Sequence, residues 1–328
     1  MELEISAGAG IEAELRTLHA DAQQRAVTEH ILALADQAGY GAALIDAVAL
    51  GHAEAAVISW PQFAHMVRTA ARGLSRRGLQ QGDTAGIFVG DAVSHVVAVH
   101  AVRAAGAVAA AVRPTRSATD IAAQLKQSRA RLLITSADLA DLGIQAAERS
   151  WVRQVFAFGE AEGTTPFDSL LQTPRHGQHQ AHDTSSNNGH NGHNGHNGHN
   201  GGSNNNGHNG SHGHAGGPAP AQVLDLAGLG PGGLGPGGLG PEGSAPQLIH
   251  RPVPRLTYRD VVVAAPPSGD PEAYTSLLDL ALAAGATVVA APLAQVTAAI
   301  GVYKGTAAIV PRGTGIPGLP AGRVLAVG

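Results

Sequence analysis

The sequence predicts an α/β protein built from parallel βαβ units. Short apolar runs that suit buried strands alternate with segments whose apolar residues recur at helical spacing. Helical segments of about 10–15 residues are long enough to cross over between two parallel strands. An apolar fraction of 44% in 328 residues is enough for a sizeable core. These observations favour a layered fold with parallel-rich sheets.

Composition divides the chain into four parts. Residues 1–42 form a helical segment, as one helix or two, because apolar residues recur at helical spacing up to a stop at Gly39. Residues 43–171 and 248–328 carry the alternating strands and helices. Residues 172–247 hold the repeat HNGHNGHNGHNG and a Gly-Leu-Pro-rich repeat. We expect this insertion to be disordered, because it cannot bury enough apolar surface to offset its ordering entropy.

The clearest helix follows Ser59. A serine there can cap the helix, Pro61 suits its first turn, and Gly78 suits its end. Its apolar stripe comprises Phe63, Val67, Ala70 and Leu74. The runs expected to form strands are TAGIFV, AVAAAV, RLLIT and QVFAFG before the insertion, and DVVVAAP, TVVAAP and TAAIVP after it, with GRVLAVG as a further candidate.

Charge and composition exclude several classes of function. The net charge of −4 gives no footprint for nucleic acid or an anionic membrane. With no cysteine, the chain has no disulfide, thiolate metal site or thiol nucleophile. No apolar run reaches the roughly 18 residues that span a bilayer, and the acidic N-terminus is unlike a signal peptide. We therefore expect a cytoplasmic protein without membrane or nucleic-acid partners.

Several motifs in a fixed order carry a family resemblance. A helix opening on SWPQF leads to the turn GLQQGD, the strand TAGIFV and a helix ending in RAAGAV, followed by RPT and ATDIAAQLKQSRARLLIT. VFAFGEAEGTTPFDSLL comes next, and DVVVAAPPSGD opens the second half. In this order, residues 43–171 and 248–328 resemble the N-terminal region of the adenylate-forming, AMP-binding acyl-CoA synthetases, which include 4-coumarate–CoA ligase. The resemblance implies a partial, truncated N-terminal domain of that fold.

The resemblance also identifies a degenerate nucleotide loop. In the family, a loop of the form S/T-S-G-T-T-G-x-P-K-G holds the ATP phosphates. Here LIHR, with His250 and Arg251, resembles the segment after that loop, and GLGPEG lies upstream of it. The positions that correspond are Gly238, Gly240, Glu242 and Gly243, with Glu242 in the place of the lysine. A carboxylate repels phosphates and the prolines lack N–H donors, so a flexible linker is favoured over a working site for ATP and Mg²⁺.

No residue falls on a catalytic position of the family with its required chemistry intact. The Y-G-x-T-E-like motif, the ribose-binding aspartate and the catalytic lysine of the family would follow Gly328. APPSGD stands where the family has a P-x-F-H-like segment. The resemblance therefore predicts no catalytic residue in this sequence.

Histidines in the insertion form a second candidate site. His190, His193, His196 and His199 recur at every third position, and neutral imidazoles bind Ni²⁺ or Zn²⁺. The repeat offers no fixed geometry or supporting partners, which metal sites usually have. Three interpretations stay open: a polar linker that binds metal incidentally, a metal-handling tract, and an interaction tract with condensation-prone Asn/Gly character.

Other candidates are weaker. Asp91 and Ser94 follow a strand, where α/β proteins often bind ligands. His65, His95 and His100 lie on helices among apolar residues and are expected at the solvent edge or in the core. Arg72, Arg76 and Arg77 fit a solvated helix end that complements the helix dipole, and GTGIPGLPAG is expected to be a loop.

These patterns favour a catalytically inactive pseudo-enzyme that acts as a binding or regulatory module. Its expected partner is an intact synthetase or another protein chain. Two alternatives remain: an ATP-dependent acyl-CoA ligase completed by another chain, and a Ni- or Zn-binding protein that works through the histidine tract.

Overall fold

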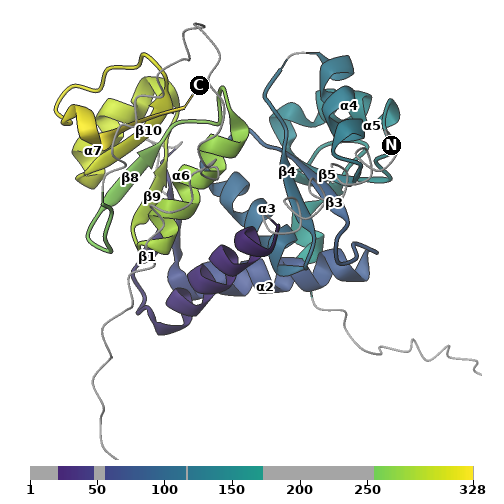
Figure 1. Ribbon diagram of the computed structural model, residues 1–328, viewed down its shortest axis with the longest axis horizontal. Helices are drawn as coiled ribbons and strands as arrows, with labels where there is room; N and C mark the ends of the chain where they lie inside the picture. The colour runs from purple at the N-terminus through teal and green to yellow at the C-terminus, as the bar shows by residue number, and fades with distance from the viewer. Residues whose placement is uncertain (1–20, 48–55, 116, 173–254, 328) are drawn as a thin grey trace, which may run out of the picture. The chain divides into compact units, whose positions relative to one another are not determined.

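The computed structural model describes residues 21–47, 56–115, 117–172 and 255–327 (Figure 1). Its helices are a stretch over residues 21–37, α2 (Trp60–Arg76), α3 (Ala92–Ala104), α4 (Ala118–Gln127), α5 (Ala140–Glu148), α6 (Pro271–Ala283) and α7 (Val296–Tyr303). Short 3-10 turns are η1 (Ala137–Leu139), η2 (Phe167–Leu170), η4 (Leu293–Gln295) and η5 (Ala321–Arg323). None of the helices in these ranges is long and apolar enough to cross a membrane.

The strands of the described residues form two sheets. The first has the order β11-β10-β8-β9-β1-β2, and the second has the order β4-β3-β5-β6-β7. The strands are β1 (Ala42–Asp46), β2 (Ala56–Ser59), β3 (Thr84–Phe88), β4 (Val108–Ala111), β5 (Ala130–Ser136), β6 (Gln154–Phe158), β7 (Thr165–Pro166), β8 (Val261–Ala264), β9 (Thr287–Ala290), β10 (Ala307–Pro311) and β11 (Val324–Val327). Every neighbouring pair is parallel except β1 with β2, which confirms the predicted parallel-rich α/β fold.

The first sheet combines strands from distant parts of the sequence. β1 pairs in parallel with β9, with Leu44 opposite Val288, and β2 completes that edge. Residues before the insertion thus extend a sheet whose other strands come from residues 261–327. The described parts of the two halves share one core as a result.

Helices cover both faces of each sheet. One apolar cluster packs α7 on an outer face of the six-stranded sheet, and another packs α4 and α5 on an outer face of the five-stranded sheet. The largest cluster lies between the two sheets and takes in α2, α3, α6 and the helix over residues 21–37 (Figure 1). The described elements therefore alternate as helix, sheet, helix, sheet and helix layers.

Buried strands have apolar side chains on both faces, as layering requires. In β8, Val262 and Ala264 join the central cluster, whereas Val263 faces α7. This follows from the two-residue period of a strand, which sends successive side chains to opposite faces.

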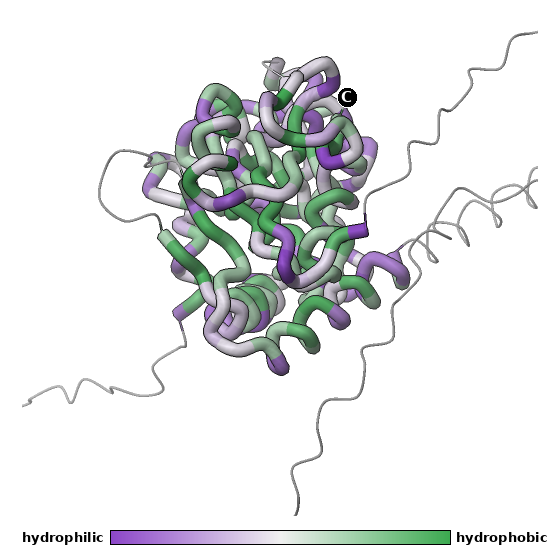
Figure 2. The backbone as a smooth tube through the Cα atoms, turned by 90° about the vertical axis from the view of Figure 1, so that its left-hand side faces the viewer, coloured by the Kyte–Doolittle hydropathy of each residue, from purple (hydrophilic) through white to green (hydrophobic). Residues whose placement is uncertain are grey.

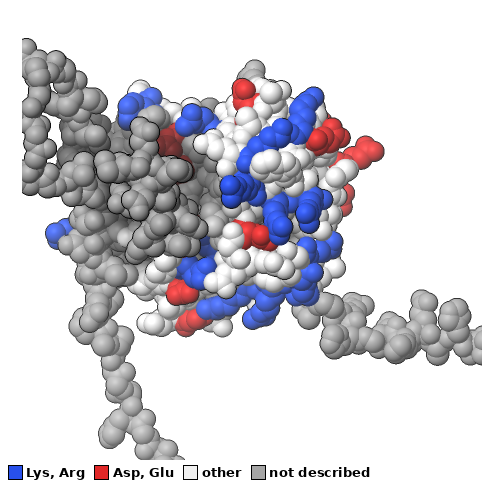
Figure 3. All heavy atoms as spheres, turned by 45° about the vertical axis from the view of Figure 1, so that its right-hand side comes forward, with Lys and Arg blue, Asp and Glu red and all other residues white. Residues whose placement is uncertain are grey.

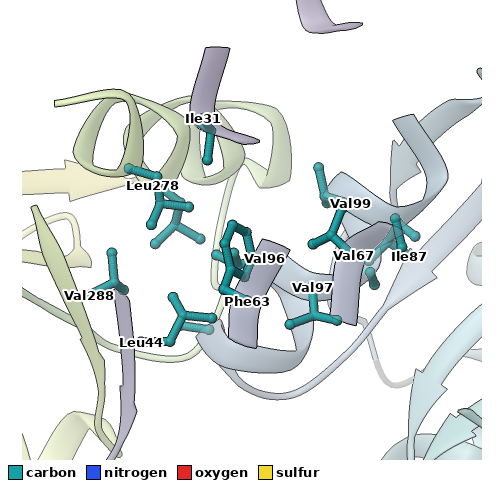
Figure 4. Packing of buried hydrophobic residues seen from close by; sticks show 14 of the residues in the cluster. Ile31, Leu44, Phe63, Val67, Ile87, Val96, Val97, Val99, Leu278 and Val288 are labelled. Carbon is teal, nitrogen blue, oxygen red and sulfur yellow. The ribbon is translucent and has the colours of Figure 1, made fainter. Parts of the chain in front are cut away.

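Hydrophobic and charged residues are separated between the inside and the outside of the fold. Figure 2 shows that hydrophobic residues concentrate along the inner parts of the chain. Figure 3 shows many Lys and Arg side chains on one outer face, with Asp and Glu side chains among them. Figure 4 shows Phe63, Val96 and Leu278 within the central cluster, from α2, α3 and α6.

The predicted helix after Ser59 is confirmed. The Ser59 side chain accepts a hydrogen bond from the Gln62 backbone N–H, and the Gln62 side chain accepts one from the Ser59 backbone N–H. This reciprocal pair is a capping box, and Pro61 lies in the first turn. All four residues of the predicted stripe are buried: Phe63, Val67, Ala70 and Leu74.

One glycine of α2 is required by a close approach. A Cβ at Gly73 would lie 2.5 Å from the carbonyl oxygen of Leu170 in η2. Backbone atoms cannot move away from such a contact as a flexible side chain can. Gly73 therefore allows η2 to pack directly on α2.

The remaining elements follow the sequence prediction with local differences. The segment ADLADLGIQAAERS begins as the 3-10 turn η1 before α5, and the run GTGIPGLPAG is a loop as expected. GRVLAVG contributes β11, whereas β1, β2 and β7 were not predicted. The first 20 residues of the predicted helical segment lie outside the described residues. The insertion predicted to be disordered also lies outside them, apart from Gln172 at its start.

Candidate functional site

Three aspartates lie at the carboxyl ends of parallel strands. Asp46 ends β1, Asp91 follows β3, and Asp138 lies in η1 after β5. Burial raises the pKa of Asp91, hydrogen bonds from Ser94 oppose this, and the charges of Asp46 and Asp138 raise the pKa further. Because the charges of Asp46 and Asp138 both act on Asp91, the three groups lie near one another. We call this region the carboxyl edge.

The loops after β3 and β5 are held together at this edge. The backbone N–H of Gly90 donates to Ser136 Oγ at 3.0 Å. A Cβ at Gly90 would lie 2.9 Å from Asp138 Oδ2, so glycine leaves room for that carboxylate. Asp91 is the N-cap of α3, and its Oδ1 accepts a hydrogen bond of 2.7 Å from the Ser94 backbone N–H. The carboxylate thus has a structural role as a helix cap.

Tyr274 of α6 is buried beside the carboxyl edge. Its hydroxyl donates to the Ala265 carbonyl oxygen at 2.8 Å, and its ring meets the His95 ring edge to face, with 5.3 Å between centroids. Burial raises the pKa of Tyr274, and the Asp91 charge raises it further. Tyr274 therefore stays protonated and acts as a fixed hydrogen-bond donor.

His95 is a neutral core histidine. The Thr275 hydroxyl donates its single proton to the Pro271 carbonyl oxygen at 2.8 Å. It must therefore accept from His95 Nε2, which lies 2.8 Å away, and this assigns the proton to Nε2. Burial lowers the pKa of His95 to about 3, and the charges of Arg103 and His100 lower it further.

Further along α3, a second cluster of polar side chains connects α3 with α6 and with the helix over residues 21–37. Arg103 Nη1 donates to Asp279 Oδ2 of α6 at 2.8 Å, and His100 Nε2 lies 3.5 Å from Asp279 Oδ1. Thr28 Oγ1 lies 2.9 Å from His100 Nδ1. Burial lowers the pKa of His100 to about 4, Asp279 acts in the opposite direction and Arg103 lowers it again. His95 and His100 are core residues as expected, whereas His65 is exposed.

The carboxyl edge has little capacity for chemistry. It presents carboxylates, a capped helix end and a tyrosine whose hydroxyl is already bonded. No group of three or more His, Cys, Asp or Glu side chains among the described residues is arranged to hold a metal ion. The two charged groups that act on Asp91 are both carboxylates, so this edge disfavours an anion.

The site residues predicted from the sequence lie elsewhere in the chain. The degenerate nucleotide loop with Gly238, Gly240, Glu242, Gly243, His250 and Arg251 lies outside the described residues. The histidines His190, His193, His196 and His199 also lie outside them. Both sites therefore remain predictions.

Sequence reasoning identified Asp91 and Ser94 but missed their neighbours. Asp138 lies just after a strand that the sequence predicted, so the same rule about strand ends could have found it. Asp46 was missed because β1 was not predicted. Tyr274 carried no signal, because an aromatic residue on a helix is most often part of the core.

Comparison with known families gives a match to part of the chain. Residues 37–187, just under half of the 328 residues, match the family described as AMP-binding enzyme. Over these residues, the chain is similar to that family. The match includes Asp46, Asp91 and Asp138 of the carboxyl edge, whereas Tyr274 lies beyond it. Comparison with curated proteins gives no significant match.

Solved structures of two CoA ligases and an amide bond synthetase share the fold. A long-chain-fatty-acid-CoA ligase from Archaeoglobus fulgidus matches with a TM-score of 0.56 and 15% identity, over 87% of this chain and 51% of that one. A benzoate CoA ligase from Burkholderia xenovorans LB400 matches with a TM-score of 0.53 and 16% identity, over 92% and 54%. An amide bond synthetase from Marinactinospora thermotolerans matches with a TM-score of 0.54 and 14% identity, over 88% and 48%. The chain therefore spans about half the length of these proteins.

Proposed function

We propose that this chain is a catalytically inactive relative of the acyl-CoA synthetases that acts as a binding or regulatory module. The observation that carries the proposal is the acidic carboxyl edge. Ligands of open α/β sheets usually bind at the carboxyl ends of the strands. Here Asp91 is partly buried, the two charged groups that act on it are the carboxylates of Asp46 and Asp138, and neither supplies the positive charge that attracts a triphosphate.

The sequence of the nucleotide-loop counterpart supports the same conclusion. Glu242 takes the place of the family's lysine, and the prolines of the segment remove backbone N–H donors. A phosphate cradle needs N–H donors and positive charge. The side chains of Asp46, Asp91 and Asp138 supply neither N–H donors nor positive charge for phosphates, so we assign no chemical step to them.

The partner that we propose is a second protein of the same fold class, such as an intact acyl-CoA synthetase. The chain places β2, β4, β7 and β11 at the ends of its described sheets. Backbone groups at a sheet edge can pair with another chain, which makes such an association physically reasonable.

One alternative is an acid–CoA ligase that depends on further polypeptide for its active site. The observation in its favour is the retained scaffold, which matches solved ligases over most of this chain. In that case, the acidic edge would need cationic groups supplied by the completing polypeptide.

Acid-dependent exchange between ATP and pyrophosphate tests the proposal. The purified chain is incubated with Mg-ATP, labelled pyrophosphate and a panel of fatty and aromatic acids, with a benzoate CoA ligase as the positive control. We expect no exchange above that of a sample without protein. Exchange that depends on the added acid would overturn the proposal, because it requires formation of an acyl-adenylate.

A second arm distinguishes the alternative. The chain is co-purified with an intact synthetase from the same source, and the mass of the mixture is measured by light scattering. A complex in which the synthetase activity changes supports a regulatory module, and a complex with unchanged activity supports a binding module. Exchange activity that appears only when a catalytically disabled synthetase is added would favour the completed ligase.

A further inference from the structure

An arginine-lined groove lies at the opposite ends of the strands from the three aspartates. It has a volume of about 630 Å³ and is bounded by the helix over residues 21–37, by α2 and by the end of α3. Gln81 and Gly106, which line it, precede β3 and β4. A smaller hollow of about 270 Å³ shares Arg25, Gln81, Arg103 and Gly106 with it. We call this region the amino-edge groove.

Five arginines among the described residues line the groove, and two of them are neutralised. Arg68 donates through both terminal nitrogens to Asp36, at 2.7 and 2.6 Å. Arg103 is paired with Asp279. The positive charge of these two side chains is therefore largely balanced within the protein.

The other three arginines form no close ion pair within the described residues. Arg25 donates to the Gly106 carbonyl oxygen at 3.2 Å, and Arg76 donates to the Gln172 carbonyl oxygen at 3.1 Å. A carbonyl carries no net charge, so both guanidinium groups remain positive. Arg72 is exposed and has no hydrogen bond or ion pair in the described part of the chain.

Two carboxylates offset part of this charge in the described lining. Glu29 lines the larger hollow, and Asp21 lines the smaller one. Burial raises the pKa of Asp21, and the charge of Arg25 opposes this. Since three arginines without a close counter-ion stand against these two carboxylates, the groove keeps a net positive charge.

Helix dipoles explain only part of this arrangement. Arg76 and Arg103 lie in the last turns of α2 and α3, where a cation is favoured. Arg25 lies on a different helix, well before its end, and Arg72 lies one turn before Arg76. The dipole gives no reason for these two arginines to line the same hollow.

Arg103 adds an independent observation. Its side chain is only 5% exposed, and its Nε has no hydrogen-bond partner within the described part of the chain. A buried donor without a partner is costly, and such groups in native proteins call for an explanation. Arg103 lines both hollows, so an acceptor that enters the groove comes close to this guanidinium.

We propose that the amino-edge groove binds a small molecule through two or more of its phosphate groups. Guanidinium groups match phosphate oxygens with paired hydrogen bonds. The groove has the size of a small-ligand pocket. No aromatic side chain of the described residues lines it, so the groups that it offers for recognition are the cations that suit phosphates. The net charge of −4 disfavours a long nucleic acid as the ligand.

Calorimetric titration with inorganic tripolyphosphate, without Mg²⁺ and at low ionic strength, tests this site. The test variant is Arg72→Ala with Arg76→Ala, and both residues are exposed. Because Lys and Arg side chains are common on the surface (Figure 3), the control must remove equal charge elsewhere. It is Arg77→Ala with Arg149→Ala, at exposed positions outside the groove lining. Circular dichroism confirms that all the variants are folded.

We expect the wild-type chain to bind tripolyphosphate and the test variant to bind it at least about tenfold more weakly. The control should change the affinity by less than about twofold, and added salt should weaken the wild-type interaction. Absence of binding by the wild-type chain at millimolar tripolyphosphate would overturn the proposal. An equal loss in both variants would also overturn it, because it would show general attraction to positive charge.

This inference does not depend on the proposed function. Tripolyphosphate has no adenosine and cannot form an acyl-adenylate, so its binding is measured separately from exchange activity. Failure of either experiment leaves the result of the other intact.

Discussion

The two ends of α3 have opposite electrostatic character. At its N-cap, Asp91 is partly buried beside other carboxylates, and at its last turn Arg103 lines a groove with further arginines. Both residues suit the helix dipole, which favours anions at the N-terminus and cations at the C-terminus. The same fold therefore offers an anion an unfavourable site at the carboxyl edge and a favourable one at the amino edge. The usual ligand edge of an α/β sheet and the electrostatically favourable edge are different places in this molecule.

The ion pair at the cationic end of α3 gives the largest expected effect. Asp279→Ala should lower the free energy of unfolding by about 3–5 kcal/mol, because it leaves the buried Arg103 without its counter-ion. Urea denaturation at neutral pH measures the loss. Asp36→Ala is the matched control, since it breaks the more exposed pair with Arg68 and should cost clearly less. Similar losses in the two variants would show that the Arg103–Asp279 pair between α3 and α6 stabilises the fold no more than the exposed Arg68–Asp36 pair does.

The middle of α3 is expected to make the fold sensitive to acid. The pKa of His95 is lowered to about 3 by burial, so the unfolded chain takes up a proton at higher pH than the folded chain. The stability that neutral His95 contributes is present above pH 6.5 and is lost as the pH falls toward the folded value. By about pH 4, this loss is on the order of 3 kcal/mol.

His95→Gln tests this acid sensitivity, because glutamine stays neutral and can still donate to Thr275. The difference in unfolding free energy between about pH 7 and about pH 4 should be smaller in this variant. His65→Gln serves as the control, since His65 is exposed, and it should leave the difference unchanged. An unchanged difference in His95→Gln would contradict the assignment of a neutral buried imidazole.

The anionic end of α3 gives the smallest expected effect. The pKa of Asp91 is higher in the folded chain than in the unfolded chain. Protonation of Asp91 therefore stabilises the folded state at low pH, and this contribution is lost as the pH rises through the folded pKa. Asp91→Asn keeps a helix cap and removes the charge, so it should raise the thermal midpoint at about pH 7 more than at about pH 4. Asp91→Ala also loses the cap and should be about 1 kcal/mol less stable than Asp91→Asn. A lower midpoint for Asp91→Asn at neutral pH would show that the carboxylates do not repel one another.

Local signals in the sequence were sufficient for most elements. Ser59, Pro61 and the four-residue apolar stripe define α2 within a few residues, because caps and periodicity act within one helix. The strand runs were recognised in the same way. β1 was missed because a five-residue strand is stabilised by its neighbour, and its neighbour β9 lies more than 240 residues further along the chain.

The sequence predicted less of the candidate site than of the helices and strands. Asp91 and Ser94 were identified from their place after a strand, but the convergence of Asp91 with Asp46 and Asp138 needs β1, β3 and β5 in position. The amino-edge groove was not predicted. Its arginines on α2 were interpreted as a solvated helix end, and only packing of the helix over residues 21–37 brings Arg25 to the same hollow.

The sequence by itself determined the class of the fold and most of its helices and strands. These properties depend on spacing and capping over short stretches, which a single chain displays directly. Motifs in a fixed order also carried the resemblance to the AMP-binding acyl-CoA synthetases. The tertiary structure decided which strands share a sheet, that His95 and His100 are neutral, and that acidic and cationic groups gather at opposite edges. These properties depend on contacts between residues far apart in the chain, and burial sets their energies.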